Sequence, residues 1–166
     1  MTDVDAARES LYRRTAWVDD RLATLAWWTD PELLAVLGAG LAGLFPESRP
    51  SLIAGVQSSG YLLAPLVATH WGVGMLAVQK LPQPDGSILL ATLEEPVTGA
   101  RWPRPGDRVL LVDDVVETGA QAAAVRDLVV GRGAHWVGAA VMVAYRARPD
   151  LGVRALASVD DLRRRA

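Results

Sequence analysis

Two adjacent carboxylates follow an apolar run in the stretch "RVLLVDDVVETGAQ", residues 108–121. The run at 109–112 suits a buried central strand, and ligands of open α/β sheets bind just beyond the carboxyl ends of such strands. Asp113 and Asp114 would lie at that place. Because neighbouring residues of a strand point to opposite faces, we expect the strand to end and the backbone to turn between the two acids if both face one ligand.

The residues after these acids favour anion binding. Gly119 permits close backbone approach, and a helix beginning at Ala120 would turn unpaired N–H groups and the positive end of its dipole toward the loop. Carboxylates beside such a site would repel an anion unless they hold sugar hydroxyls or a bridging Mg²⁺. A phosphorylated sugar meets both requirements, and the alternative is that the two acids only cap a turn.

The elements that would position this site form a second pattern. From Ser51 onward, short apolar runs alternate with helical stretches, which is typical of parallel strands covered on both faces. We expect strands at 52–56, 74–78, 109–113, 136–145 and 153–157, and helices at 60–71 and 120–131. The segment 81–106, rich in proline, predicts a long mobile loop or hairpin, with a possible strand at 88–93.

Helices precede this pattern. The apolar spacing over residues 5–28 predicts one amphipathic helix. The stretch "TDPELLAVLGAGLAGLF" predicts a second, with Asp30 as its cap and Pro31 at its first position. The expected buried stripe of the second helix consists of Leu33, Leu34, Leu37, Leu41 and Leu44. The sequence therefore predicts one α/β domain over 1–166, with a helical segment at 1–50 and a core at 51–166.

Composition excludes several classes of protein. The chain has 166 residues, of which 51% are hydrophobic and 22% charged, as in ordinary globular domains. The absence of cysteine excludes disulfides and thiolate chemistry and suits a reducing cytoplasm. The net charge of −2 argues against a broad nucleic-acid surface. An acidic N-terminus and short apolar runs argue against a signal peptide or a membrane span, so we expect no nucleic-acid or membrane partner.

A family resemblance adds to this interpretation. "VLLVDDVVETGAQ" resembles the motif with which type I phosphoribosyltransferases bind 5-phosphoribosyl 1-diphosphate (PRPP). "TDPELLAVLGAGLAGLF", "LIAGVQSSGYLLAPLVATHWGVGMLAVQK" and "PGDRVLLVDDVVETGAQ" are similar to the N-terminal helix, the pyrophosphate loop with its helix and next strand, and the PRPP loop of the adenine type. The resemblance implies a mostly parallel twisted sheet flanked by helices, an N-terminal hood and a flexible lid at 81–106.

The resemblance also implies a reaction and its participants. The phosphoribosyl group of PRPP would pass to a nucleobase, purine-like by preference, with release of pyrophosphate. Mg²⁺ would enter with PRPP without a direct protein ligand, and the chain would be a homodimer. Asp113 and Asp114 would bind the ribose hydroxyls, and Lys80 would reach the leaving pyrophosphate, so these three residues are the catalytic candidates.

The remaining site residues follow from the same resemblance. PRPP binding is assigned to Asp113, Asp114, Val116, Glu117, Thr118, Gly119, Ala120 and Gln121. Pyrophosphate binding is assigned to Gln57, Ser58, Ser59, Gly60 and Lys80, and contact with the base to Tyr145, Arg146 and Trp28.

Three departures from the adenine-type pattern leave two hypotheses open. The family usually carries an arginine in the loop at 57–60, an Arg-Lys pair where this chain has Gln79 and Lys80, and Thr or Ser at Gln121. Each missing arginine would remove about 1.5–3 kcal/mol of charged hydrogen bonding, which Arg101 and Arg104 of the lid could replace. The chain is then either an active transferase or a non-catalytic PRPP- or nucleotide-binding module with a regulatory role.

Other kinds of site have less support. His70 and His135 are not spaced as metal ligands or as part of a serine triad. A two-component receiver domain would place its paired acids near its start, whereas only 52 residues follow Asp114 here. Trp17 and Trp27, like Trp28, lie in the expected hood, where stacking on the base competes with simple core packing.

Overall fold

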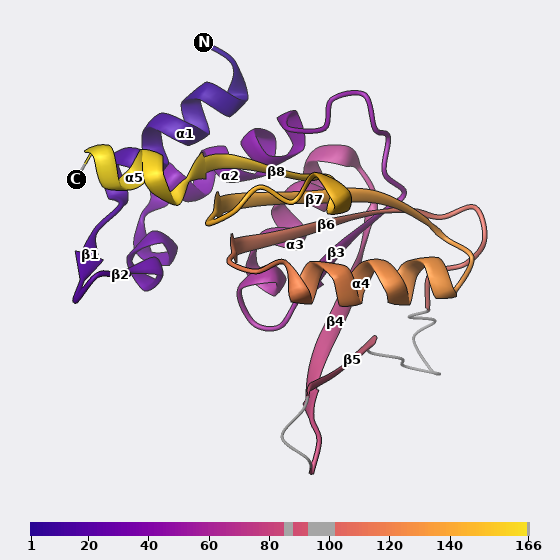
Figure 1. Ribbon diagram of the computed structural model, residues 1–166. Helices are drawn as coiled ribbons and strands as arrows, with labels where there is room; N and C mark the ends of the chain where they lie inside the picture. The colour runs from indigo at the N-terminus through magenta and orange to yellow at the C-terminus, as the bar shows by residue number, and fades with distance from the viewer. Residues whose placement is uncertain (85–87, 93–101, 166) are drawn as a thin grey trace.

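The computed structural model describes residues 1–84, 88–92 and 102–165. It confirms the α/β class, with every expected core strand and helix present (Figure 1). The elements before the main sheet are α1 (Asp3–Arg14), β1 (Trp17–Val18), β2 (Arg21–Leu22), the 3-10 helix η1 (Thr24–Thr29) and α2 (Pro31–Gly43). Those that follow are β3 (Leu52–Val56), α3 (Ser59–Trp71), β4 (Gly74–Pro82), β5 (Ile88–Thr92), β6 (Arg108–Val116), α4 (Ala120–Gly131), β7 (His135–Ala144), the 3-10 helix η2 (Pro149–Leu151), β8 (Val153–Ser158) and α5 (Val159–Arg165).

The main sheet has the strand order β5-β4-β3-β6-β7-β8 and is parallel except for β5, which runs antiparallel to β4. The chain moves outward from β3 to β4 and then returns to β6 on the other side of β3. Helix α3 packs on the same face as α1 and α2, whereas α4 covers the opposite face (Figure 1). Such a change of direction opens a crevice at the carboxyl ends of the two central strands.

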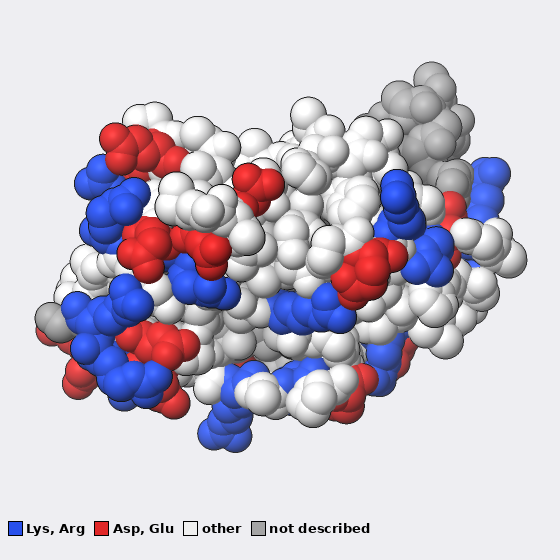
Figure 2. Space-filling model, turned by 90° about the horizontal axis from the view of Figure 1, so that it is seen from above, with Lys and Arg blue, Asp and Glu red and all other residues white. Residues whose placement is uncertain are grey.

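Charged side chains of both signs lie intermixed on the face seen in Figure 2. Exposed ion pairs of the structure include Arg154 with Glu47 and Arg164 with Asp161. Exposed pairs of this kind each add little to stability, about 0–1 kcal/mol. Among the described residues, the helices are all too short or too polar to cross a bilayer.

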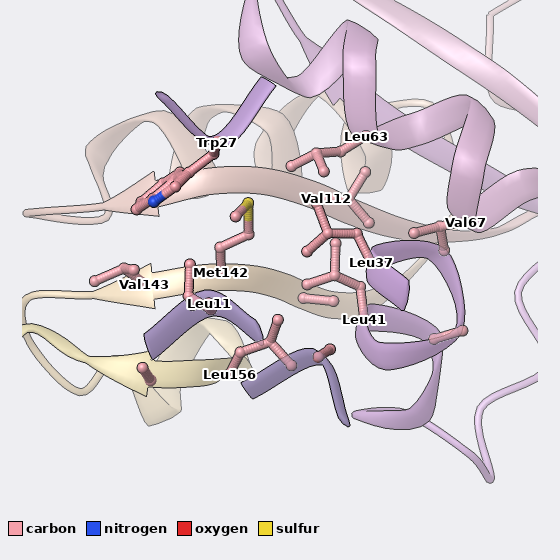
Figure 3. Packing of buried hydrophobic residues seen from close by; sticks show 14 of the residues in the cluster. Leu11, Trp27, Leu37, Leu41, Leu63, Val67, Val112, Met142, Val143 and Leu156 are labelled. Atoms are coloured by element: carbon pink, nitrogen blue, oxygen red, sulfur yellow. The ribbon is translucent and has the colours of Figure 1, made fainter. Parts of the chain in front are cut away.

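The larger core cluster lies between the sheet and helices α1 to α3 (Figure 3). Leu11, Leu37 and Leu63 pack from the helices against Val112 and Met142 of the strands, and all are fully buried. Burying a side chain of this size contributes roughly 1.5–3 kcal/mol. Trp27 belongs to the same cluster, with no exposed surface, so it packs in the core and does not offer a face to a base.

The predicted helix over 5–28 is wrong beyond Arg14. Helix α1 ends there, and β1 and β2 form a short antiparallel hairpin. Asp19 and Asp20 occupy the turn with φ of 48° and 59°. Aspartate tolerates this left-handed conformation, which a two-residue hairpin turn requires, so the local turn chemistry outweighed the helical spacing.

Helix α2 begins as predicted. Asp30 caps it by accepting a hydrogen bond from the N–H of Leu33 at 2.7 Å, and Pro31 is its first residue. In the expected stripe, Leu33, Leu37 and Leu41 are buried, whereas Leu34 and Leu44 are only partly covered.

Strand β4 runs four residues further than predicted, to Pro82, because β5 pairs with its extension from Val78 to Pro82. The possible strand at 88–93 is confirmed as β5, and Figure 1 shows the two strands extending away from the body of the molecule. The expected lid also includes residues 85–87 and 93–101, which lie outside the described residues.

Candidate functional site

A cavity of about 650 Å³ lies at the carboxyl ends of β3 and β6, where the topology places the crevice. Three separate segments of the chain, at 57–59, 80 and 111–122, form its walls. The lining residues are Gln57, Ser58, Ser59, Lys80, Leu111, Asp113, Asp114, Val115, Val116, Glu117, Thr118, Gly119, Ala120, Gln121 and Ala122. Every residue predicted to bind PRPP is in this set, as is every residue predicted to bind pyrophosphate except Gly60.

Gly60 lies behind the cavity instead. A Cβ atom on Gly55 would come within 2.2 Å of the Gly60 carbonyl oxygen, and one on Gly60 would lie 3.0 Å from the Gly55 carbonyl carbon. The two glycines therefore let α3 begin in direct contact with β3, which brings Ser58 and Ser59 to the edge of the cavity.

The acids lie within β6 and not beyond its end. The strand continues in register with β7 through Val116, so the expectation that it ends at Asp113 is wrong. Leu111 and Val116 both pack on the α4 face although they are five positions apart, an odd spacing, and Val115 packs on the opposite face. The usual alternation of side chains is therefore shifted once between residues 111 and 116. This shift lets both acids line the cavity while the strand continues.

Side chains take over part of the backbone hydrogen bonding at the shift. The N–H of Asp114 donates to Oδ1 of Asp113 at 3.0 Å, and the N–H of Val115 donates to Oδ1 of Asp114 at 2.8 Å. Neither carboxylate forms an ion pair within the described part of the chain. Both acids therefore keep oxygen lone pairs for a ligand.

Asp113 is the more buried of the two acids, with 6% of its surface exposed. Burial, together with the negative charge of Asp114, raises its pKa from 3.8 to about 7, and Lys80 opposes this shift. The Nε2 group of Gln121 donates to Oδ2 of Asp113 at 2.7 Å. Asp113 is therefore a carboxyl group that is held in place and whose pKa lies near neutral pH.

The turn between β6 and α4, residues 117–119, has the features of an anion site. Gly119 has φ of 81° and directly precedes α4, and the N–H of Ala120 donates to Oγ1 of Thr118 at 3.3 Å. Within the described residues, the N–H groups of Thr118 and Gly119 have no acceptor. Free N–H groups at the positive end of a helix bind anions such as phosphate.

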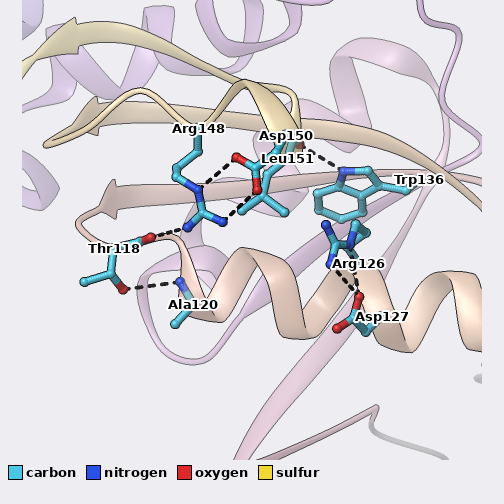
Figure 4. Close-up of polar contacts among 8 residues, drawn as sticks. All are labelled: Thr118, Ala120, Arg126, Asp127, Trp136, Arg148, Asp150 and Leu151. Carbon is cyan, nitrogen blue, oxygen red and sulfur yellow. Dashed lines mark hydrogen bonds and ion pairs between the residues drawn. The ribbon is translucent and has the colours of Figure 1, made fainter.

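Arg148, which the sequence did not single out, contacts this turn from outside the cavity. Its Nη1 donates to the carbonyl oxygen of Thr118, and Asp150 pairs with the same guanidinium (Figure 4). It follows β7 and belongs to no motif, so sequence patterns gave no signal for it.

Lys80 and the loop after β3 form the opposite wall of the cavity. The N–H of Lys80 donates to Oε1 of Gln57 at 3.2 Å, and the N–H of Gln57 donates to the Val78 carbonyl at 2.9 Å. These bonds attach the loop to β4. The wall thus combines the ammonium group of Lys80 with the hydroxyl groups of Ser58 and Ser59.

Comparison with curated proteins decides the family. An adenine phosphoribosyltransferase of Rhodococcus opacus (strain B4) is 37% identical over 159 residues, which cover 86% of this chain and 88% of that protein. The chain belongs to the adenine phosphoribosyltransferase family. A relative of the same name from Nocardia farcinica is 39% identical over 155 residues, covering 84% of this chain and 78% of that protein. The adenine phosphoribosyltransferase of Frankia alni is 38% identical over 122 residues. This match covers 68% of the present chain and 63% of the Frankia protein, less than two thirds of its length. No family model matches the chain.

Solved structures confirm the type I phosphoribosyltransferase fold. The adenine phosphoribosyltransferase of Rhodothermus marinus superimposes with a TM-score of 0.76 at 24% identity, over 93% of this chain and 99% of that one. The orotate phosphoribosyltransferase of Mycobacterium tuberculosis gives a TM-score of 0.69 at 20% identity, over 98% of this chain and 91% of that one.

Arg104, one of the two residues expected to replace the arginines of the adenine phosphoribosyltransferase family, does not line the cavity in this structure. Arg104 is exposed in the turn before β6, where its N–H donates to Oδ2 of Asp107 at 2.7 Å. Five residue steps of β6, at about 3.3 Å each, separate Arg108 at the start of the strand from Asp113 in the cavity, which is roughly 17 Å. Compensation by Arg104 therefore requires that it move toward the cavity and stays a prediction, and Arg101 lies outside the described residues.

The residues expected to contact the base do not line the cavity either. Tyr145 follows β7, and its N–H donates to the Val116 carbonyl at 2.9 Å, which places its backbone beside the acid-bearing strand. Arg146 is exposed, and Trp28 is partly buried against the larger core cluster. Their role as base contacts stays a prediction.

Proposed function

We propose that the chain transfers the 5-phosphoribosyl group of PRPP to adenine and releases pyrophosphate. One observation carries this proposal: two carboxylates and the free N–H groups at the start of α4 face a single cavity, as a phosphorylated sugar requires. The curated relatives that match most of the chain are named as adenine phosphoribosyltransferases, which supports adenine as the acceptor.

The ribose and its 5-phosphate occupy the α4 side of the cavity in this proposal. Asp113 and Asp114 accept hydrogen bonds from the two ribose hydroxyls, since both acids retain oxygen lone pairs. The N–H groups of Thr118 and Gly119 and the Thr118 hydroxyl bind the phosphate. The acids hold the neutral part of the ligand, so that their charge lies away from the anion.

The pyrophosphate leaves on the opposite side, toward Lys80. The bond from the anomeric carbon to the pyrophosphate oxygen breaks, and its electron pair goes to that oxygen. A nitrogen of the base supplies the pair for the new bond, and the proton that this nitrogen carried passes to water. Lys80 stabilises the charge that develops on the leaving group, and the hydroxyls of Ser58 and Ser59 donate to its oxygens.

The site fits Mg²⁺ that arrives with the substrate. No group of three or more His, Cys, Asp or Glu side chains converges within the residues that the structure describes. One or two carboxylates together with substrate phosphates and water are an ordinary environment for Mg²⁺. When bound, Mg²⁺ would neutralise part of the pyrophosphate charge.

Further parts of the proposal rest on the family resemblance. Residues 1–50 cover the base within one domain, Tyr145, Arg146 and Trp28 contact it, and residues 81–106 close over the reaction. The chain works as a homodimer in the cytoplasm. None of the comparisons favours the non-catalytic alternative, and the curated relatives are named as transferases.

The test is release of pyrophosphate from Mg²⁺-PRPP in the presence of adenine, guanine, hypoxanthine, uracil or orotate. We expect release with adenine, and a loss of about 10- to 100-fold in Asp114→Asn, since its charge-assisted contact with a ribose hydroxyl, of about 1.5–3 kcal/mol, is weakened. The control is Asp127→Asn, an exposed acid on α4 paired with Arg126, which should act as wild type. Binding of PRPP without release for any base would support the non-catalytic alternative and overturn the proposal.

A further inference from the structure

Arg148 joins two parts of the chain that lie 30 residues apart. Its Nη1 donates to the carbonyl oxygen of Thr118, in the β6–α4 turn. Its Nε and Nη2 donate to the two carboxylate oxygens of Asp150 at 2.9 and 2.8 Å (Figure 4). Because a guanidinium is planar and holds its donors in a fixed fork, the bidentate pairing with Asp150 fixes the direction from which Nη1 approaches the turn.

The guanidinium of Arg148 occupies the space that a side chain at position 119 would need. A Cβ atom on Gly119 would lie 2.4 Å from Nη1 and 3.1 Å from Cζ of Arg148. The turn therefore needs glycine for two reasons, the positive φ and the close approach of Arg148.

The contact with Thr118 sets the direction of the next N–H group. In a trans peptide the C=O and the N–H point in opposite directions, so the Gly119 N–H points away from Arg148 when the Thr118 carbonyl points toward it. Gly119 lines the cavity, and its N–H has no acceptor among the described residues. A charge-assisted bond to the carbonyl also polarises the peptide and makes this N–H a stronger donor.

We infer that Arg148 is a positioning residue: from behind the β6–α4 turn it fixes the Thr118–Gly119 peptide with its N–H toward the cavity, and so sets the affinity for the 5-phosphate of PRPP. The inference deepens the proposed function and rests on it. Because Asp150 balances the charge of Arg148, the effect comes from the geometry of the fork and not from a net positive charge.

The test compares three ligands of one cavity by calorimetry: ribose 5-phosphate, PRPP with Mg²⁺, and pyrophosphate with Mg²⁺. We expect Arg148→Met to weaken ribose 5-phosphate and PRPP by about 10- to 100-fold, the range for one charge-assisted hydrogen bond. Pyrophosphate, held by Lys80 and the loop after β3, should change by less than twofold. In turnover, KM for PRPP should rise by the same factor while kcat falls by less than threefold.

Two further variants separate positioning from general damage to the fold. Arg148→Lys keeps the charge but loses the fork, so it should recover only part of the lost affinity. Arg126→Met is the matched control, because Arg126 lies near Asp150, pairs with its own neighbour Asp127 and makes no bond to the turn (Figure 4). It should bind all three ligands as wild type.

Each outcome decides one claim. If wild type binds neither ribose 5-phosphate nor PRPP, the proposed function fails. If wild type binds them and Arg148→Met matches it within twofold, or loses pyrophosphate equally, the positioning inference fails and the proposed function stands. If Arg148→Met does not fold, Asp150→Asn decides, because it frees the guanidinium without removing it. A loss of about three- to tenfold is expected for ribose 5-phosphate and PRPP but not for pyrophosphate, and no loss overturns the inference.

Discussion

The amide of Gln121 donates a hydrogen bond to the buried carboxylate of Asp113, with 2.7 Å between Nε2 and Oδ2. Gln121 lies in the first turn of α4, the helix whose start offers N–H groups to the cavity. One helical turn therefore both forms the anion site and fixes the acid beside it. The departure from Thr or Ser at this position has a structural role in this chain.

Gln121→Glu would place a second carboxylate against Asp113. Repulsion would raise the pKa of Asp113 further, and we expect PRPP to bind at least tenfold more weakly at pH 7, as measured by calorimetry. Ala124→Glu adds the same charge at an exposed position of the same helix and should leave binding unchanged. Equal affinities for the two variants would show that Gln121 does not support Asp113.

The binding of PRPP should depend on pH through Asp113. Burial and Asp114 raise its pKa to about 7, and the ionised form is the better acceptor for a ribose hydroxyl. Affinity should therefore rise with pH between about 6 and 8 and level off above, by up to about tenfold per pH unit below the pKa. Asp113→Asn should remove this dependence of affinity on pH. Any dependence that remains in the variant comes from titration of the phosphates of the ligand. The same slope in both proteins would contradict the assignment.

Gly119→Ala should damage the site more than the fold. A positive φ costs an alanine roughly 1–2 kcal/mol, and its Cβ would displace Arg148 from the turn. We expect a fall of several degrees in Tm and a loss of PRPP affinity of more than tenfold. Gly131→Ala, at the other end of α4, meets no atom within 4 Å and has no positive φ, so it should bind normally. Normal binding by Gly119→Ala would argue against the turn as an anion site.

Lys80 is the single lysine of the chain, which permits a direct chemical test of the pyrophosphate site. An amine-reactive reagent should modify Lys80 and the N-terminal amine, and Mg²⁺-pyrophosphate should protect only Lys80, by about tenfold in rate. Mass spectrometry of the peptides gives both rates, so the N-terminus is the internal control. Equal protection of the two amines, or of neither, would place pyrophosphate elsewhere.

Sequence reasoning succeeded where local patterns determine structure. The apolar run at Leu52–Val56 gave β3, and the glycine before Ala120 gave the start of α4. The paired acids and the turn after them likewise identified one wall of the cavity, because a strand, two acids and a glycine turn occupy contiguous positions.

It failed where a contact joins distant segments or where two local preferences compete. The bond from Arg148 to Thr118 spans 30 residues and leaves no periodic pattern. The shift of side-chain alternation in β6 lies between residues 111 and 116, where the strand stays in register with β7, and the sequence alone does not reveal it. In the hairpin before α2, Asp19 and Asp20 favoured a turn within a helical spacing of apolar residues.

The most direct test of the central claim is a crystal structure of the chain with ribose 5-phosphate. The account predicts the phosphate at about 3 Å from the backbone nitrogens of Thr118 and Gly119, with the ribose hydroxyls donating to Asp113 and Asp114. A phosphate bound at another place, or a ribose that does not contact the two acids, would contradict it.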